Sequence, residues 1–368
     1  MSNARNLANL LGTGTQITTA YIADGAFQAN RNLVINGAMQ VAQRGTSGAT
    51  GNGYNSVDRF RIASGGTSQW ALTQTQETDA PTGFSKSTKY SCVTAETTLD
   101  AADWAGIQYT FEGQDLQHLS YGSASAQSIT LSFWVKSSAT GTFGVSLFQP
   151  NDSRVIGSTY TISSANTWEQ KIITFAGDTT GIIDNVNTEG LRIYWLLAAG
   201  SIYTGTDNTS WKAYTSNAFA DGHAVNLIDS TSDNFYLTGV QLEVGETATP
   251  FEHRSYGQEL ALCHRYYQTL TVLNTTYSAA ISYTGGSNAV LPTTNFSTMR
   301  AAPSVTFNSS GNIEYFNGSA WADTTVVAQD TTDNYTVIIA SGAGVVSKGS
   351  LIRADQGVPL NALLDAEL

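Results

Sequence analysis

The residues of this sequence best suited to chemistry are aromatic side chains in a long polar segment. Residues 201–234 are rich in Ser, Thr, Asn and Asp and contain Tyr203, Trp211 and Tyr214. An exposed ring can stack on the apolar face of a sugar, while amides and carboxylates bond the hydroxyls. The segment therefore predicts a glycan-binding loop, and the alternative is that its rings cover a sheet edge or an interface between copies.

Other tryptophans extend this prediction. Trp321 follows Asn317-Gly318, a dipeptide typical of tight hairpin turns. A ring beside a hairpin tip is well placed to meet a ligand, so Trp321 is a further glycan-binding candidate. Trp70 and Trp104 rank after Tyr203, Trp211 and Tyr214 and before Trp321.

Five carboxylates in two loops offer the alternative of polysaccharide cleavage. They are Asp178, Asp184 and Glu189 in one loop and Asp100 and Asp103 in the other. Glycosidases use two carboxylates at a set separation. Acids in polar loops are usually only solvated, however, and the sequence contains no G-x-S-x-G motif and no long repetitive segment of the kind found in polysaccharide-degrading spikes. We expect no enzyme activity.

Metal and thiol chemistry have little support. Asp229 and Asp233 are suggestively spaced in one loop, but no EF-hand-type loop with its closing Glu is present. Cys263 and His264 are adjacent on a predicted helix and so point to different faces, which argues against zinc. Cys92 and Cys263 lie far apart among apolar neighbours. We expect them to be buried free thiols, with a disulfide as the alternative.

Composition limits the classes of partner. Charged residues make up 12% of the 368 residues, the net charge is -12, and no Lys/Arg cluster occurs. Nucleic-acid binding by a basic groove is therefore not expected. No apolar run is long enough to cross a bilayer, and the N-terminus lacks the pattern of a secretory signal.

Short alternating segments separated by turn residues predict an all-β chain with two domains. The larger, residues 32–254, is predicted to be a β-sandwich jelly roll. Its clearest strand is ITLSFWVK, which places Ile129, Leu131, Phe133 and Val135 on one face. The chain opens this domain with NLVINGAMQVAQR and closes it with NFYLTGVQLEV. Residues 269–368 are predicted to form a smaller β-sandwich.

A short helix over 255–268 is predicted to link the two domains. Ser255 and Gln258 have the spacing of a capping box. One apolar stripe contains Tyr256, Leu260, Cys263 and Tyr267. A surface this apolar must pack against its own domains or against copies of itself around a threefold axis, which makes these four residues the candidates for an interface between copies.

Residues 1–31 are too polar to bury themselves. Leu7, Leu10 and Leu11 could share one face of a short helix. This arm is either a disordered terminus or a docking peptide that orders on a partner.

Two resemblances arise from ordered motifs. RNLVINGAMQVAQRG, SITLSFWVKSS, NTWEQKIITFAGDTTG and FYLTGVQLEVG resemble the jelly rolls of carbohydrate-binding modules with a galactose-binding-like fold. NLVINGAMQVAQRGTS, VDRF, QLEVGETATPFEHRSYGQELALCHRYYQ and FSTMRAAPSVTF, taken together, resemble tail fibres and tail-associated proteins of tailed bacteriophages. The second resemblance covers about three quarters of the chain.

The resemblances imply a structural virion protein, a homotrimeric tail fibre that attaches to other tail proteins by its N-terminal arm and contacts host surface glycans. It would reside in the virion tail and be extracellular when mature, with no membrane insertion. A polysaccharide-degrading tail spike and a head decoration or baseplate protein without host binding are the alternatives.

The galactose-binding-like jelly rolls often hold a structural calcium ion near their first and last strands, which here corresponds to Asn36, Gly37 and Glu243. The usual acidic position is Ala38, so we expect no cofactor, and structural calcium stays open as the alternative.

Overall fold

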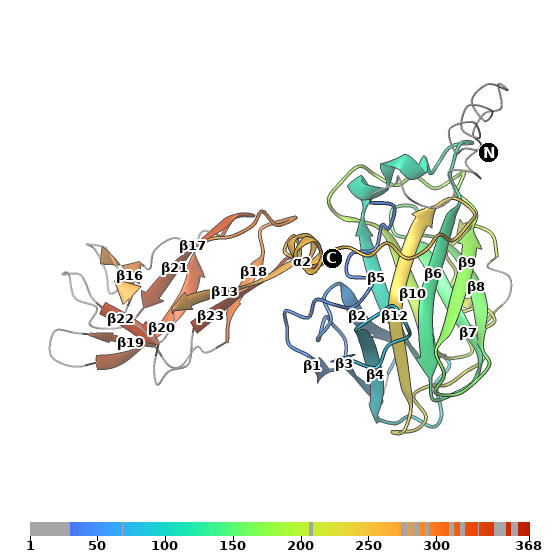
Figure 1. Cartoon of the computed structure of the whole chain (residues 1–368), viewed down its shortest axis with the longest axis horizontal. Coiled ribbons are helices and arrows are strands. Elements are labelled where there is room, and N and C mark those ends of the chain that lie inside the picture. Colours follow the sequence, from blue (N-terminus) through green and yellow to red (C-terminus); the bar gives the residue numbers. More distant parts are fainter. Residues whose placement is uncertain are drawn as a thin grey trace, which may run out of the picture.

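The protein is mostly β, as the sequence predicts. A computed structural model describes residues 30–67, 69–205, 209–273, 278–279, 281–282, 288–290, 294–308, 313–316, 321–329, 331–341, 351–354 and 360–368. Two six-stranded antiparallel sheets form a sandwich, a short helix follows, and the chain continues into a three-stranded and an eight-stranded sheet (Figure 1). Among the described residues, no helix is long and apolar enough to span a membrane.

The sandwich places the first and last strands of its domain in one sheet. That sheet, which we call sheet A, has the order β1-β3-β4-β12-β6-β9, and sheet B has the order β11-β8-β7-β10-β5-β2. The elements of sheet A are β1 (Ser47–Thr50), β3 (Ala71–Glu77), β4 (Ser87–Thr94), β6 (Ile129–Ser137), β9 (Glu169–Phe175) and β12 (Asn234–Val244). Those of sheet B are β2 (Phe60–Gly65), β5 (Trp104–Glu112), β7 (Gly141–Gln149), β8 (Arg154–Ile162), β10 (Glu189–Ala199) and β11 (Lys212–Ala213), and two short 3-10 helices, η1 (Gly113–Leu119) and η2 (Ser216–Ala218), lie in the connections.

The core lies between the sheets. Ile129, Leu131, Phe133 and Val135 are fully buried in it, which confirms the alternation predicted for this strand. Edge-to-face aromatic pairs help to fill it, including Phe133 with Trp195 at 5.9 Å between centroids.

The opening segment differs from its prediction. Residues 32–44 form no regular strand, because the backbone turns through Asn36 (φ 61°) and Met39 (φ 57°). The segment still lies against the closing strand β12, since the Leu33 N–H donates to the Leu242 carbonyl and the Val240 N–H to the Gly37 carbonyl, both at 2.9 Å. A Cβ at position 37 would lie 2.1 Å from the Val240 carbonyl oxygen, so this close approach requires glycine.

The linking helix is shorter than predicted. Helix α2 spans Tyr256–Cys263, and Tyr267 already begins strand β13. Its capping box is confirmed: the Gln258 N–H donates to the Ser255 hydroxyl, and the Ser255 N–H donates to the Gln258 side chain.

The C-terminal part contains a small three-stranded sheet, β13-β23-β18. A further sheet runs β14-β22-β19-β20-β21-β16-β15, with β17 paired to β21. The elements are β13 (Tyr267–Leu273), β14 (Ser278–Ala279), β15 (Ile281–Ser282), β16 (Asn288–Val290), β17 (Thr294–Asn295), β18 (Ser304–Phe307), β19 (Ile313–Phe316), β20 (Trp321–Gln329), β21 (Tyr335–Ser341), β22 (Leu351–Ala354) and β23 (Leu360–Asp365). Strands β19 and β20 pair antiparallel up to Phe316 and Trp321, as the predicted hairpin requires, and its Asn317-Gly318 turn lies outside the described residues.

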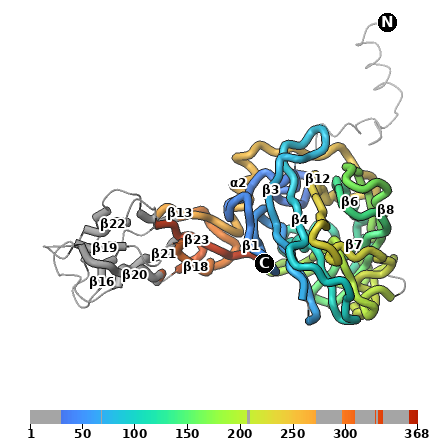
Figure 2. The backbone as a smooth tube through the Cα atoms, turned by 90° about the horizontal axis from the view of Figure 1, so that it is seen from below, coloured from blue at the N-terminus to red at the C-terminus, as the bar shows by residue number. Residues whose placement is uncertain are grey.

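The last residues return to the jelly roll, and Figure 2 shows β13, β18 and β23 at the side of the sandwich where the chain ends. Glu367 forms an ion pair with Arg59, and the exposed fractions of these two side chains are 4% and 1%. Arg44 contacts Glu367 and Asp365 at 3.4 and 3.1 Å. Arg265, just after α2, forms a two-pronged pair with buried Glu112, with both bonds at 2.7 Å. Buried charges therefore join the two domains.

Replacing Glu367 with Ala should lower the free energy of unfolding by about 3–5 kcal/mol, because it leaves the Arg59 guanidinium buried without its carboxylate. Denaturant unfolding followed by Trp fluorescence measures this loss. The exposed Glu246 is the matched control, and Glu246→Ala should change stability by no more than about 0.5 kcal/mol. A loss below about 1 kcal/mol for Glu367→Ala, the range of a surface pair, would contradict the role assigned to this ion pair.

Candidate functional site

The outer face of sheet B combines aromatic and hydrogen-bonding side chains. In β10, Leu191, Ile193 and Trp195 point into the core, so the alternating Arg192 and Tyr194 point outward. The same alternation turns Phe148 outward from β7, Gln108 and Thr110 from β5, and Arg61 from β2. We call these six residues the outer-face set.

A loop, described over residues 201–205 and 209–222 and called the 201–222 loop below, covers part of this face. Phe219 is its anchor, with its ring 4.9 Å from Trp104 and 5.0 Å from Tyr194. The Ser146 hydroxyl of β7 donates to the Phe219 carbonyl. The loop is also closed internally, because the Ala220 N–H donates to the Tyr203 carbonyl at 3.0 Å.

The loop brings together two of the predicted glycan-binding residues. Tyr203 and Tyr214 both pack against Phe219, at 5.9 and 6.3 Å, and Tyr214 also meets Phe148 edge-on at 5.3 Å. Both tyrosines stay partly exposed. The rings of Tyr203 and Tyr214 cover part of the sheet, which was the alternative expectation for this segment, and each ring keeps a partly exposed surface.

The other predicted aromatic candidates are placed elsewhere. Trp211 lies away from this cluster, against Tyr121 at 5.8 Å, and its indole N–H donates to the Ala176 carbonyl at 2.7 Å. Trp104 belongs to the cluster around Phe219, whereas Trp70 is buried in the core. Trp321 begins β20, and its side chain falls outside the described residues.

The polar members of the outer-face set form two adjoining rows. Arg61, Gln108 and Tyr194 are paired across β2, β5 and β10, and Thr110 is paired with Arg192 one step along. The Gln108 amide donates to the Thr110 hydroxyl at 3.0 Å, and Arg192 donates to the Tyr194 hydroxyl at 3.2 Å. Burial raises the pKa of Tyr194, so its phenol keeps its proton at neutral pH. Gln108, Thr110 and Tyr194 are buried, so the polar groups of these rows that stay partly exposed are the guanidinium groups of Arg61 and Arg192.

Sequence reasoning missed most of this set. Phe148, Tyr194 and Arg192 lie in segments that were predicted to be strands, whereas the predicted glycan-binding residues were aromatic side chains in loops. The pattern that could have identified them is the alternation of core-facing and outward-facing residues along a strand. It places large aromatic and charged side chains on the outward side of β7 and β10.

The loop carboxylates are held by donors. Asp178 forms a two-pronged pair with Arg154, with bonds at 2.5 and 3.0 Å. Asp184 accepts from Asn151, and Glu189 pairs with Arg192. Asp103, fully buried, accepts from the backbone N–H groups of Thr67 and Asp100 at 2.7 and 3.2 Å.

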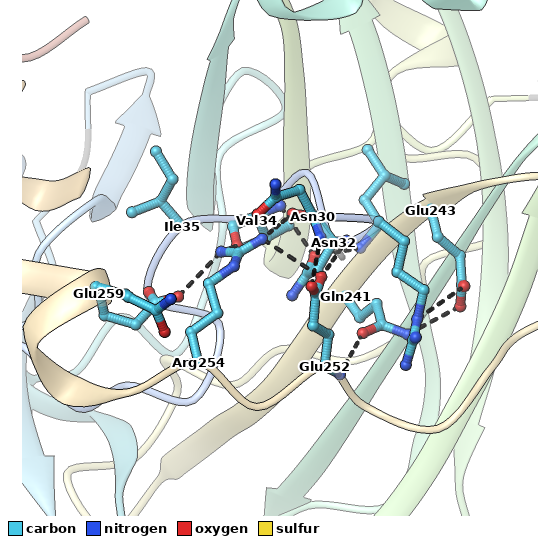
Figure 3. Close-up of polar contacts among 12 residues, drawn as sticks. Asn30, Asn32, Val34, Ile35, Gln241, Glu243, Glu252, Arg254 and Glu259 are labelled. Atoms are coloured by element: carbon cyan, nitrogen blue, oxygen red, sulfur yellow. Dashed lines mark hydrogen bonds and ion pairs between the residues drawn. The ribbon is translucent and has the colours of Figure 1, made fainter. Parts of the chain in front are cut away.

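The region where the resemblance implied calcium is occupied by protein contacts (Figure 3). Glu243 accepts from the Thr249 N–H and hydroxyl at 2.8 and 2.6 Å, and from Gln241 at 3.0 Å. The Asn36 amide donates to the carbonyls of Val41 and Asp58. Nearby, Glu252 accepts from the backbone of Asn30 and Asn32, and Arg254 bonds Glu259.

Among the residues that the structure describes, no group of three or more His, Cys, Asp or Glu side chains could hold a metal. Asp233 and Asp229 do lie against each other. Burial and this neighbour raise the pKa of Asp233. Cys92 and Cys263 are free and buried, as expected.

The predicted interface stripe divides into buried and exposed parts. Cys263 and Tyr267 are buried inside the chain, whereas Tyr256 is 55% exposed and Leu260 is half-buried. The apolar residues that α2 leaves partly or largely exposed are Tyr256 and Leu260 on one face and the 38% exposed Leu262 on another. Leu7, Leu10 and Leu11 of the predicted attachment arm lie outside the described residues.

Comparison with known proteins gives similarities of fold. No protein-family model and no curated protein matches the sequence. An enzymatically active domain of tailspike protein 4 of bacteriophage CBA120 is 14% identical with a TM-score of 0.32, over 58% of this chain and 21% of that one, so the match spans about a fifth of the tailspike chain.

Two further structures match over nearly their whole length. A family 22 carbohydrate-binding module of Clostridium thermocellum Xyn10B is 14% identical with a TM-score of 0.31, over 60% of this chain and 99% of that one. A putative sugar-binding protein from Bacteroides thetaiotaomicron is 10% identical with a TM-score of 0.31, over 58% and 99%. At these TM-scores the matches are likenesses of the β-sandwich fold and nothing more.

The loop on the outer face should respond to acid through His223. Its side chain is buried, its Nδ1 accepts the Gly144 N–H at 3.0 Å, and burial lowers its pKa from 6.5 to about 4. The unfolded chain binds this proton near pH 6.5 and the folded chain only near pH 4, so stability falls as the pH falls through that window, by up to about 3 kcal/mol.

Unfolding curves measured every half pH unit would show this slope. His223→Gln keeps an acceptor for the Gly144 N–H and removes the titration, so its slope between pH 6.5 and 4 should be shallower. Equal slopes for the two proteins would contradict the assignment to His223.

Proposed function

We propose that this chain is a non-catalytic glycan-binding protein that uses the outer face of sheet B. The observation that carries the proposal is the convergence of partly exposed rings, Tyr203, Tyr214 and Phe148, with the partly exposed guanidinium groups of Arg61 and Arg192 on one face of a sheet. Sugar rings have an apolar face and a polar rim, and this arrangement offers a partner for each.

The absence of catalysis is part of the same proposal. Each acid of the 177–190 loop is engaged with a hydrogen-bond donor, and Glu189 neutralises Arg192. Side chains fixed in this way suit recognition of hydroxyls better than proton transfer.

We place this activity in a homotrimeric tail fibre of a phage virion, attached by its N-terminal arm and extracellular when mature. Support for this setting comes from the ordered motifs that resemble tail-fibre proteins. The exposed apolar side chains of α2 support self-association, because Tyr256 and Leu262 are large and face solvent. The alternatives are a polysaccharide-degrading spike and a head or baseplate protein.

Tyr214→Ala and Phe148→Ala should each weaken binding to a glycan found by array screening about fivefold or more, because each removes a stacking surface worth about 1 kcal/mol. Tyr236, a partly exposed tyrosine on the outer face of sheet A, is the matched control, and Tyr236→Ala should leave the affinity unchanged. Calorimetric titration measures all three. Equal losses for Tyr236→Ala and Tyr214→Ala would move the site away from sheet B, and a complete lack of array and whole-cell signal would reject glycan binding.

Mass photometry of the full chain should give three times the chain mass. The double variant Tyr256→Ser, Leu262→Ser should shift it toward the single chain, because it removes the exposed apolar surface of α2. The buried Cys263 should stay unreactive toward thiol reagents in both proteins, which checks that the helix remains folded. A lone chain mass for the parent protein at micromolar concentration would reject the trimer.

A further inference from the structure

One arginine on the outer face of sheet B, Arg61, has no acidic partner among the described residues of a protein whose net charge is -12. Arg61 and Arg192 both lie on this face. Arg192 is paired with Glu189 and bonds the Tyr194 hydroxyl. Arg61 makes no ion pair with any residue in the described part of the chain, and its guanidinium lies 5.5 Å from the centroid of the Tyr54 ring.

The two arginines are close enough to act on one ligand. Arg61 of β2 pairs with Gln108 of β5, and Gln108 pairs with Tyr194, two residues from Arg192 in β10. Neighbouring strands are about 4.8 Å apart, so two strand spacings separate the backbones by about 10 Å. Long arginine side chains on the same face can span such a distance from both sides. Gln108 and Thr110, bonded to each other, lie between them.

Neither guanidinium has its full set of partners within the described residues. The Nε atoms of both Arg61 and Arg192 are buried without a hydrogen-bond acceptor. A guanidinium presents a planar fork of donors that matches a carboxylate with two parallel bonds. A bound carboxylate would bond the terminal guanidinium nitrogens rather than the buried Nε atoms, and it would balance the charge of Arg61, since Arg192 already pairs with Glu189.

We propose that the glycan recognised here is acidic, and that a sugar carboxylate binds at Arg61 with Arg192 in support. The inference rests on the proposed glycan-binding function and adds its substrate class. Phe148 lies one strand beyond Arg192, so the rings and Arg61 are about three strand spacings, or ~14 Å, apart. That distance exceeds one pyranose ring, so the ligand is an oligosaccharide with its acidic residue over β2 and β5 and another residue against Phe148 and Tyr214.

Matched pairs of polysaccharides test the charge without changing the backbone. The probes are polygalacturonate, alginate and polysialate, each beside its methyl ester, titrated against the full-length protein. At least one acid form should bind about tenfold or more tightly than its ester, since charge-assisted bonds are the stronger kind. Dextran sulfate tests for unspecific attraction of polyanions, and it should bind no better than the esters.

Substitutions at position 61 test whether Arg61 causes the preference for the acid form over the ester. Arg61→Gln should weaken binding of the preferred acid about tenfold and leave binding of its ester unchanged, while Arg61→Lys should recover part of the loss because it restores charge without the fork. Lys89→Gln removes one positive charge from sheet A and should have no effect. Thermal melting of each variant checks that the domain stays folded.

The outcomes separate the two proposals. If esters bind as well as acids, or if Arg61→Gln lowers both equally, acidic recognition is rejected and glycan binding stands. If Lys89→Gln weakens binding as much as Arg61→Gln, or if dextran sulfate competes as well as the acids, the effect belongs to overall charge and the site assignment is rejected. If no probe binds and glycan arrays are also blank, both proposals fail.

Discussion

One buried guanidinium connects the parts of this protein. Arg59 lies between the rings of Tyr266 and Tyr109, at 3.4 and 5.3 Å, donates to the Thr110 carbonyl, and pairs with Glu367. These partners come from the core of sheet B, from the residues after α2 and from the end of the chain. A buried charge is tolerated only when its partners are in place. Because Arg59 needs all these partners, it fixes the positions of helix α2 and of strand β23 relative to sheet B. Arg59 also has φ of 72°, an unusual conformation for a side-chain-bearing residue that persists where surrounding contacts over-determine it.

The same constraint reaches the proposed binding face. Arg59 and Arg61 are two residues apart, and the Thr110 carbonyl that accepts from Arg59 belongs to the residue whose hydroxyl accepts from Gln108. The contacts of Arg59 therefore also fix the β2–β5 edge of the outer face. The opposite edge is held by the loop, in which Phe219 packs on Trp104 and Tyr194. Aromatic rings fixed by packing lose little freedom when they bind, so a face built this way is pre-organised.

The strands of the sandwich could be predicted because alternation is a local property. Asn234–Val244 is a strand with the predicted bounds, and the apolar face of Ile129–Ser137 is the buried one. Strand β8 escaped prediction because its sequence, RVIGSTYTI, contains Gly157 and several Ser and Thr residues that read as a turn. The opening segment was predicted wrongly for another reason: its apolar residues are buried by turns rather than by a pleated strand.

The candidate site could not be predicted from local patterns. It depends on which rings of the 201–222 loop pack on the sheet, and on which arginine side chain forms an ion pair with an acid. Trp211 is an example, because its indole packs at the edge of the core, whereas Tyr214, three residues later, packs on the outer face of sheet B.

The geometry of the face has a consequence for how strongly it can bind. Tyr203 and Tyr214 are only partly exposed, and Tyr194 is almost wholly covered, so each chain offers little ring surface to a sugar. A few stacked rings and hydrogen bonds that replace bonds to water give modest affinity at a single site. Presenting several identical sites on one particle converts later binding events into intramolecular ones, which can raise overall affinity by a factor of about 10²–10⁴ without a new contact. The proposed trimer and the proposed glycan site thus depend on each other. A site on sheet B that binds weakly on its own is useful in a protein that carries three copies of it around an axis. The exposed apolar side chains of α2 are the part of the chain through which we propose that the copies associate.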